Sequence, residues 1–162
     1  MIDASLSRFA GTCEWIGDAD VSALVEWIAS IPFSEWHQQA PIDGQLRPSM
    51  MTDLDWHGFG AITDPVVAKL SRPFGWPRTC QRMLSVIMPG HQIGPHVDEQ
   101  GPHWLARIHL PLCTNDRSTF IVGGITHRLR VGGAYKVNTL VEHAVDNQGA
   151  APRIHFMFDA LL

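Results

Sequence analysis

From residue 79 to the C-terminus the chain is a series of short β-prone runs separated by Gly, Pro and Asn. This pattern restricts the fold more than any other feature. Many of the runs alternate polar with apolar or β-branched residues, as strands with one buried face do. We expect strands over residues Gln81–Met88, Leu105–Leu112, Thr119–Val122, Thr126–Val131, Ala134–Asn138, Glu142–Val145 and Arg153–Phe158. Several short strands at such intervals predict a β-sandwich or barrel.

The N-terminal part of the chain has a different periodicity. Apolar residues at helical spacing predict a helix over Asp18–Ile31, with Asp18 or Asp20 as its N-cap. A second helix is expected over Thr63–Leu70, with Pro65 at an early position where its missing N–H costs little.

Residues 32–62 are rich in Pro, Gly, Trp and His and show little periodicity, so irregular segments or short strands are expected there. No linker divides the chain. We therefore expect one domain over residues 1–162, with 1–78 as a helical and irregular support and 79–162 as the β core. The fold class is mainly β with flanking N-terminal helices.

Composition excludes several classes of protein. The chain has 162 residues, of which 45% are hydrophobic and 17% charged, as in an ordinary globular domain. A net charge of −4 argues against nucleic acid as a partner. The N-terminus lacks a signal-peptide pattern, no apolar run could span a bilayer, and the 3 cysteines form no CxxC pair. A reducing compartment, the cytoplasm, is therefore expected.

The motif with the most chemistry is His96-Val97-Asp98, followed by His143 and Arg153. Residues i and i+2 of an extended segment project to the same side, so His96 and Asp98 can bind one ion together. Two imidazoles and one carboxylate are the donor set of the facial triad in non-haem Fe(II) oxygenases. His-x-Asp alone is frequent, and a single histidine such as His143 is more often a hydrogen-bonded strand-end residue.

Arg153 lies among apolar residues on an expected strand. A buried arginine needs a carboxylate, and a small diacid such as 2-oxoglutarate would supply one. Alternatively, Arg153 is a surface cation paired with Asp159. An exposed ion pair of this kind contributes little to the stability of the fold.

The tripeptide Arg-Ile-His occurs twice, at 107–109 and 153–155, each time inside an expected strand. Its polar residues share one face and the isoleucine lies on the other. These strands predict a barrel with a polar lining and an apolar outer surface.

Residues 80–160 resemble the aspartyl/asparaginyl β-hydroxylase group of 2-oxoglutarate/Fe(II) oxygenases. The matching stretches are Ser85–His96, Arg107–Leu112, Glu142–Asn147 and Arg153–Phe156. The resemblance implies a double-stranded β-helix, the jelly-roll, cupin-like fold. It also implies roles for single residues: His96 and His143 as iron ligands, Arg153 as the clamp of the distal carboxylate of 2-oxoglutarate, and Ser85, Arg107 and His109 as further groups that help to hold this cosubstrate.

Asp98 is a departure from the best-known animal members, which carry a small residue at that position. The related proline hydroxylases have the aspartate, so a full metal triad of His96, Asp98 and His143 is expected here. The aspartate argues against a halogenase, in which that position is vacated for halide. It also leaves the substrate open.

The expected function is that of a dioxygenase using Fe(II), 2-oxoglutarate and O2. It would hydroxylate a C–H bond of an amino acid or peptide side chain and convert 2-oxoglutarate to succinate. Its partner is then a small molecule or a peptide. Two alternatives stay open: a cupin-like isomerase or hydrolase with another metal, and a module that binds 2-oxoglutarate or metal without turnover. Cupins carry a His-x-His…Glu pattern that is missing here. A nucleic-acid demethylase would carry a further arginine and asparagine after Arg153.

Overall fold

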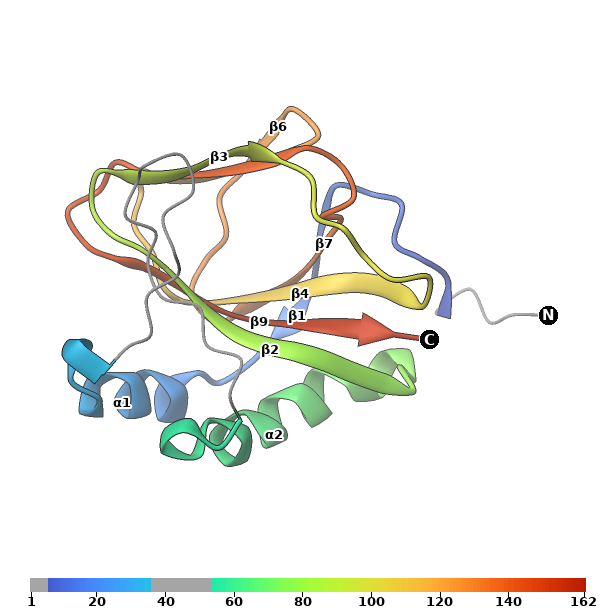
Figure 1. Ribbon diagram of the computed structural model, residues 1–162, viewed down its shortest axis with the longest axis horizontal. Coiled ribbons are helices and arrows are strands. Elements are labelled where there is room, and N and C mark those ends of the chain that lie inside the picture. Colours follow the sequence, from blue (N-terminus) through green and yellow to red (C-terminus); the bar gives the residue numbers. More distant parts are fainter. Residues whose placement is uncertain (1–5, 36–53) are drawn as a thin grey trace.

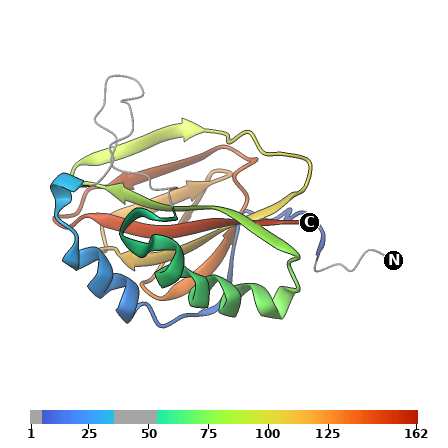
Figure 2. The ribbon, with the colours of Figure 1, turned by 60° about the horizontal axis from the view of Figure 1, so that its bottom comes forward.

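A computed structural model describes residues 6–35 and 54–162 of the chain. Two β-sheets face each other, and the helices lie on the outer side of one of them (Figures 1 and 2). The larger sheet consists, in spatial order, of β1 (Cys13–Asp18), β7 (Gly133–Val137), β4 (Trp104–Cys113), β9 (Arg153–Leu161) and β2 (Arg78–Ile87). The smaller sheet consists of β3 (His91–His96), β8 (His143–Asn147), β5 (Ser118–Val122) and β6 (Ile125–His127). This is the jelly-roll arrangement that the resemblance implies.

The main hydrophobic core lies between the larger sheet and the helices. Alternate residues of β4 and β9, among them Ile108, Leu110 and Phe156, pack there against helical side chains such as Leu24 and Phe59. In strands, residues two apart share a face, so the intervening residues of β4 and β9 must point between the two sheets. The predicted separation of a polar lining from an apolar outer surface is therefore confirmed.

The space between the sheets also holds a second, smaller apolar cluster, which the sequence did not predict. It includes Ile87, Phe120, Val122, Val137 and Val145. Polar side chains of the lining are thus packed against apolar walls, where water is largely excluded.

The helices differ in their bounds from the prediction. The first helix, α1 (Ser22–Ser30), begins after Asp18, because that residue ends strand β1. The N-cap is Val21, so neither Asp18 nor Asp20 occupies the predicted position. Asp20 lies just before the N-cap and accepts hydrogen bonds from the backbone N–H and the hydroxyl of Ser22.

The second helix, α2 (Phe59–Ser71), begins four residues before the predicted start, so Pro65 lies inside it rather than in its first turn. Short 3-10 turns flank it at Trp56–Gly58 and Arg72–Phe74, and another follows α1 at Phe33–Glu35. Within residues 32–62, the described part forms such turns and the start of α2. Residues 36–53 lie outside the described part. No helix of the described ranges is long and apolar enough to cross a bilayer.

Two strands were not predicted. His91–His96 forms β3 and pairs with β8, although the glycines and prolines in and before it are usual loop residues. β3 lies at the edge of its sheet, where Pro95 breaks no ladder, and the register shifts between Ile93 and His96. β1 pairs with β7 and was missed because its few residues lead directly into the α1 pattern.

Candidate metal centre

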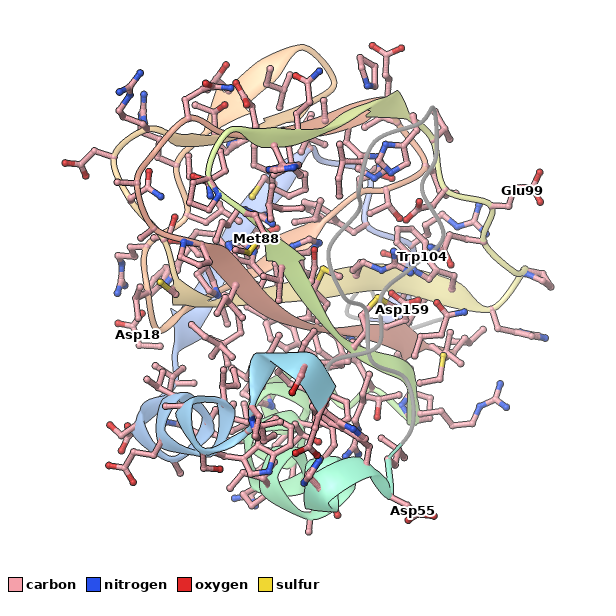
Figure 3. All side chains as sticks on the ribbon, turned by 60° about the vertical axis from the view of Figure 1, so that its left-hand side comes forward. Asp18, Asp55, Met88, Glu99, Trp104 and Asp159 are labelled. Carbon is pink, nitrogen blue, oxygen red and sulfur yellow. The ribbon has the colours of Figure 1, made fainter. Side chains whose placement is uncertain are left out.

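Three side chains with metal-binding atoms converge at one end of the smaller sheet. His96 ends β3, His143 begins β8, and the two are direct cross-strand partners. The Oδ1 atom of Asp98 lies 3.7 Å from His96 Nε2 and 3.9 Å from His143 Nε2. One ligand atom from each residue lies within 4.8 Å of the others. Glu99, the residue after Asp98, points away from the molecule (Figure 3).

Backbone carbonyls orient both imidazoles. Nδ1 of His96 lies 2.9 Å from the oxygen of Gly94, and Nδ1 of His143 lies 3.0 Å from the oxygen of Val141. A carbonyl can only accept, so each Nδ1 carries the proton and each Nε2 keeps a lone pair for an ion. The outer partner of each imidazole is therefore a backbone carbonyl.

The protonation of His143 also suits a metal ligand. Its pKa is lowered, chiefly by burial, with a smaller effect of the neighbouring His96. Neutral imidazole is the form that binds metals. Two free Nε2 atoms and one carboxylate oxygen, facing one another, fit a divalent cation such as Fe(II).

Arg153 is buried at the start of β9, with 2% of its surface exposed. Its guanidinium lies over the ring of Phe120 and donates a hydrogen bond of 3.0 Å to Nδ1 of His155. Within the described residues, no carboxylate of the protein pairs with it. Burial lowers the pKa of Arg153 to about 9. The alternative of a surface cation paired with Asp159 is therefore wrong.

His109 and His155 lie beside Arg153 and are buried as well. Since Arg153 donates to Nδ1 of His155, that atom accepts, and the ring proton must be on Nε2. Nδ1 of His109, 3.4 Å from the same atom, can then only donate. Nε2 of both rings is buried without a hydrogen-bond partner. The two histidines thus offer one donor and one acceptor to a ligand.

Ser85 lies on β2, directly opposite His155 on β9. It shares its face of the strand with Ile87, which belongs to the cluster between the sheets. The interior face of the larger sheet therefore gathers the cosubstrate residues expected from the resemblance. A small cavity beside Arg153 is lined mainly by polar side chains, which include Thr114, Ser118, Thr119, His127 and His155.

Arg107 is also on this face, but its guanidinium is already occupied by protein oxygens. It donates to Asp98, to both oxygens of Asp159 and to Gln81. Burial alone would lower the pKa of Arg107; the hydrogen bonds and charge of Asp159, then the charge of Asp98, outweigh this and raise it. These contacts favour a role toward Asp98 over the expected role in holding 2-oxoglutarate.

Asp159 was missed as part of the site. It lies on β9 (Figure 3). Its exposed fraction is 1%, and it is the cross-strand partner of Arg107. The sequence did indicate its position, because Asp159 lies an even number of residues after Arg153 and His155. In a regular strand such residues share one face, here the face toward the other sheet.

The fold and the cluster define a class of protein: a double-stranded β-helix with two histidines and a carboxylate within reach of one ion. The family model of aspartyl/asparaginyl β-hydroxylase matches residues 65–161. The chain belongs to this family, and membership supports hydroxylase activity at the level of the family.

Solved structures of similar fold agree with the architecture. AviO1 from Streptomyces viridochromogenes Tue57 superimposes with a TM-score of 0.62 at 12% identity, over 93% of this chain and 90% of that one. An oxidoreductase of the 2OG-Fe(II) oxygenase family from Burkholderia pseudomallei gives 0.59 at 14% identity, over 86% and 78%. A predicted oxalate decarboxylase from Thermotoga maritima gives 0.50 at 15% identity, over 82% and 98%. At these identities the likeness concerns the fold alone. Among curated proteins, no sequence matches this chain.

Proposed function

We propose that the protein is an Fe(II)- and 2-oxoglutarate-dependent dioxygenase that hydroxylates a C–H bond of an amino acid or a peptide side chain. The observation that carries this proposal is the convergence of His96 Nε2, Asp98 Oδ1 and His143 Nε2 within 4.8 Å of one another. Three protein ligands on one side leave positions of the ion for small molecules. Family membership supports the reaction class.

Arg153 supports 2-oxoglutarate as the cosubstrate. A buried guanidinium that has no carboxylate partner among the described residues is costly unless a ligand supplies one. Planar, two-point recognition of a carboxylate is what arginine does best. In this proposal Arg153 binds the distal carboxylate, and Ser85 and His109 bind beside it.

When bound, iron and 2-oxoglutarate would supply the oxidation, in which one atom of O2 enters the substrate and the other enters succinate as CO2 is released. The residues of the chain would hold and orient the reactants. The apolar cluster around Phe120 and Val145 would limit the access of water. The free cysteines among the described residues support the proposed cytoplasmic location.

Metal and cosubstrate binding test the proposal. Protein, Fe(II) and 2-oxoglutarate are mixed without oxygen, and the weak visible charge-transfer band of the complex is recorded. Succinate is then measured after oxygen is admitted. The wild type should give the band and form succinate, and Asp98→Ala and His143→Ala should lose both.

A matched control is His91→Ala. His91 lies on the same strand as His96, and its Nδ1 also lies near a carbonyl two residues earlier, that of Pro89, at 3.0 Å. It is not one of the converging ligands, so the variant should keep the band. Retention of the band in both ligand variants would show that the ligand assignment is wrong. If the wild type forms succinate, a screen of amino acids and short peptides for faster succinate release would identify the substrate.

A further inference from the structure

Arg107 connects the candidate metal ligand Asp98 to a second carboxylate, that of Asp159, which is not one of the three converging ligands. Its Nη1 donates to Asp98 Oδ2 at 2.6 Å. Its Nε and Nη2 donate to the two oxygens of Asp159 at 2.8 and 2.9 Å, and Nη2 also donates to Oε1 of Gln81 at 3.1 Å. All three nitrogens of the guanidinium are thus used within the protein.

The two oxygens of Asp98 have different contacts. Oδ2 accepts from the arginine, while Oδ1 is the oxygen near Nε2 of His96 and His143. Asp98 lies two residues after the last residue of β3, and its backbone N–H donates to the carbonyl of Thr139 at 2.9 Å. The backbone bond fixes the position of the residue, and the arginine fixes the rotation of its carboxylate.

Two groups hold Arg107 in turn. Asp159, 1% exposed, lies opposite it on β9 and binds it with two parallel hydrogen bonds, the most directional pairing available to arginine. Gln81 lies where the register of β2 shifts between Cys80 and Met83, and it has a positive φ of 49°. Such a backbone is rare for a residue other than glycine, and bulges of this kind redirect a side chain. Here the bulge brings the carboxamide to the arginine.

We propose that Arg107 is a positioning residue for the metal ligand, held by Asp159 and Gln81, and that it makes Asp98 a ligand through one oxygen. This inference rests on the proposed function, because it requires that Asp98 bind the ion. It assigns to Arg107 a task other than gripping the cosubstrate. A carboxylate that presents one oxygen would use one position of the ion instead of two and so would leave more positions for small molecules.

The charges explain why Asp159 should matter although it does not touch the ion. With Asp159 in place, the positive charge of Arg107 is shared between two carboxylates. In Asp159→Asn that charge has only Asp98 as a carboxylate partner. Asp98 would then be drawn toward the arginine and offer less negative charge to a cation. Changes in groups that orient metal ligands typically weaken metal affinity about 10- to 100-fold.

The test is metal affinity in the absence of 2-oxoglutarate, with Co(II) as an air-stable probe followed by calorimetry and by its visible spectrum. Asp159→Asn should bind Co(II) about 10- to 100-fold more weakly than the wild type. Its matched control is Asp64→Asn, which removes the carboxylate paired with Arg82 on the surface of α2. This control should bind Co(II) as the wild type does. Thermal unfolding of each metal-free variant reports whether it is folded.

Gln81→Gly is a second variant that leaves both charges of the buried pair in place. Glycine accepts a positive φ without strain, so the fold should be kept while the third contact of Arg107 is lost. A smaller weakening of Co(II) binding, of about 2- to 5-fold, is expected, in line with one hydrogen bond. If Asp159→Asn does not fold, this variant decides the question.

Three results separate the possibilities. Weaker Co(II) binding by folded Asp159→Asn and by Gln81→Gly, with Asp64→Asn unchanged, supports the inference. Unchanged Co(II) affinity in the folded variants, even with a weaker affinity for 2-oxoglutarate, overturns it and returns Arg107 to the cosubstrate. A wild type that binds no Co(II) refutes the proposed function itself, and the inference with it.

Discussion

Replacing Arg153 with methionine should stabilise the metal-free protein and reduce the stabilisation of the Co(II)-loaded protein by 2-oxoglutarate by more than half. The reason is the environment of the guanidinium, which is buried between the sheets without a carboxylate partner among the described residues. Methionine keeps the unbranched stem of arginine and removes the charge. One change should therefore move stability and ligand response in opposite directions.

The magnitude follows from the lowered pKa of Arg153. Burial lowers this pKa from its ordinary value to about 9, a loss of more than three powers of ten in proton affinity. Each tenfold loss is about 1.4 kcal/mol, so the cost of burying the charge is roughly 5 kcal/mol. The pKa of Arg153 is lower in the folded than in the unfolded chain. At neutral pH the arginine is charged in both the folded and the unfolded chain, so the full cost of burying the charge is present.

Two contacts of Arg153 offset part of this cost. Its guanidinium lies 5.5 Å from the ring centre of Phe120, a contact that is worth about 2 kcal/mol when desolvated. The hydrogen bond to His155 adds about 1 kcal/mol. Arg153→Met should therefore raise the free energy of unfolding by about 1 to 2 kcal/mol, allowing for imperfect packing of the new side chain.

Urea unfolding of the Co(II)-loaded and metal-free proteins measures both effects. At a 2-oxoglutarate concentration of about 100 times its Kd, the loaded wild type should gain about 2.7 kcal/mol, and Arg153→Met should gain less than half of this. Arg130→Met, which removes an exposed arginine paired with Asp18, is the control. It should change stability by less than about 0.5 kcal/mol. A metal-free Arg153→Met that is less stable than the wild type, or a full response to 2-oxoglutarate, would refute the reasoning.

Two further predictions concern the same core. Burial, and then the charge of the adjacent arginine, lowers the pKa values of His109 and His155 well below 6.5. Below about pH 6.5 the unfolded chain takes up protons that the folded chain does not. The free energy of unfolding should therefore decrease as the pH is lowered, by up to about 1.4 kcal/mol per pH unit for each imidazole. Urea unfolding at about pH 7.5, 6.5 and 5.5 measures this, and a flat profile contradicts it. Asn147→Ala should cost about 2 to 4 kcal/mol, because its buried amide donates to two backbone carbonyls, including that of Ile87 at 2.8 Å. Exposed Gln148→Ala is the control, and equal unfolding midpoints for the two variants would show that this network contributes little.

The strands of the larger sheet that carry Arg107, His109 and Arg153 could be predicted because each has one apolar face. For β4, the strand Leu105–Leu112 was expected and Trp104–Cys113 is observed. For β9, Arg153 is the first residue of both the expected and the observed strand. The alternation also indicates that Arg153 and His155 share one face of their strand. Such strands can be recognised in a sequence, since helices cover their apolar side.

β3 could not be predicted in the same way. Its Gly94 and Pro95 are usual loop residues, and they are tolerated because the strand lies at a sheet edge and its register shifts there. Whether a segment is at an edge depends on the order of strands in space, which local sequence does not record.

For the site, residue types suggested which side chains could share an ion, and the structure brings His96, Asp98 and His143 together. The link from Arg107 to Asp159 could not be found by spacing, because these residues are 52 positions apart. Their contact depends on the register between β4 and β9, which is set by the packing of the whole sheet.

Each of the two facing sheets supplies different residues of the candidate metal centre. Both imidazoles belong to the four-stranded layer, whereas the arginine that steadies the carboxylate stands on the five-stranded layer. The thickness of the sandwich is therefore itself a tuning parameter for the ion. A core change such as Val137→Ala, on the strand beside Arg107, would then alter metal binding by letting the layers settle closer together.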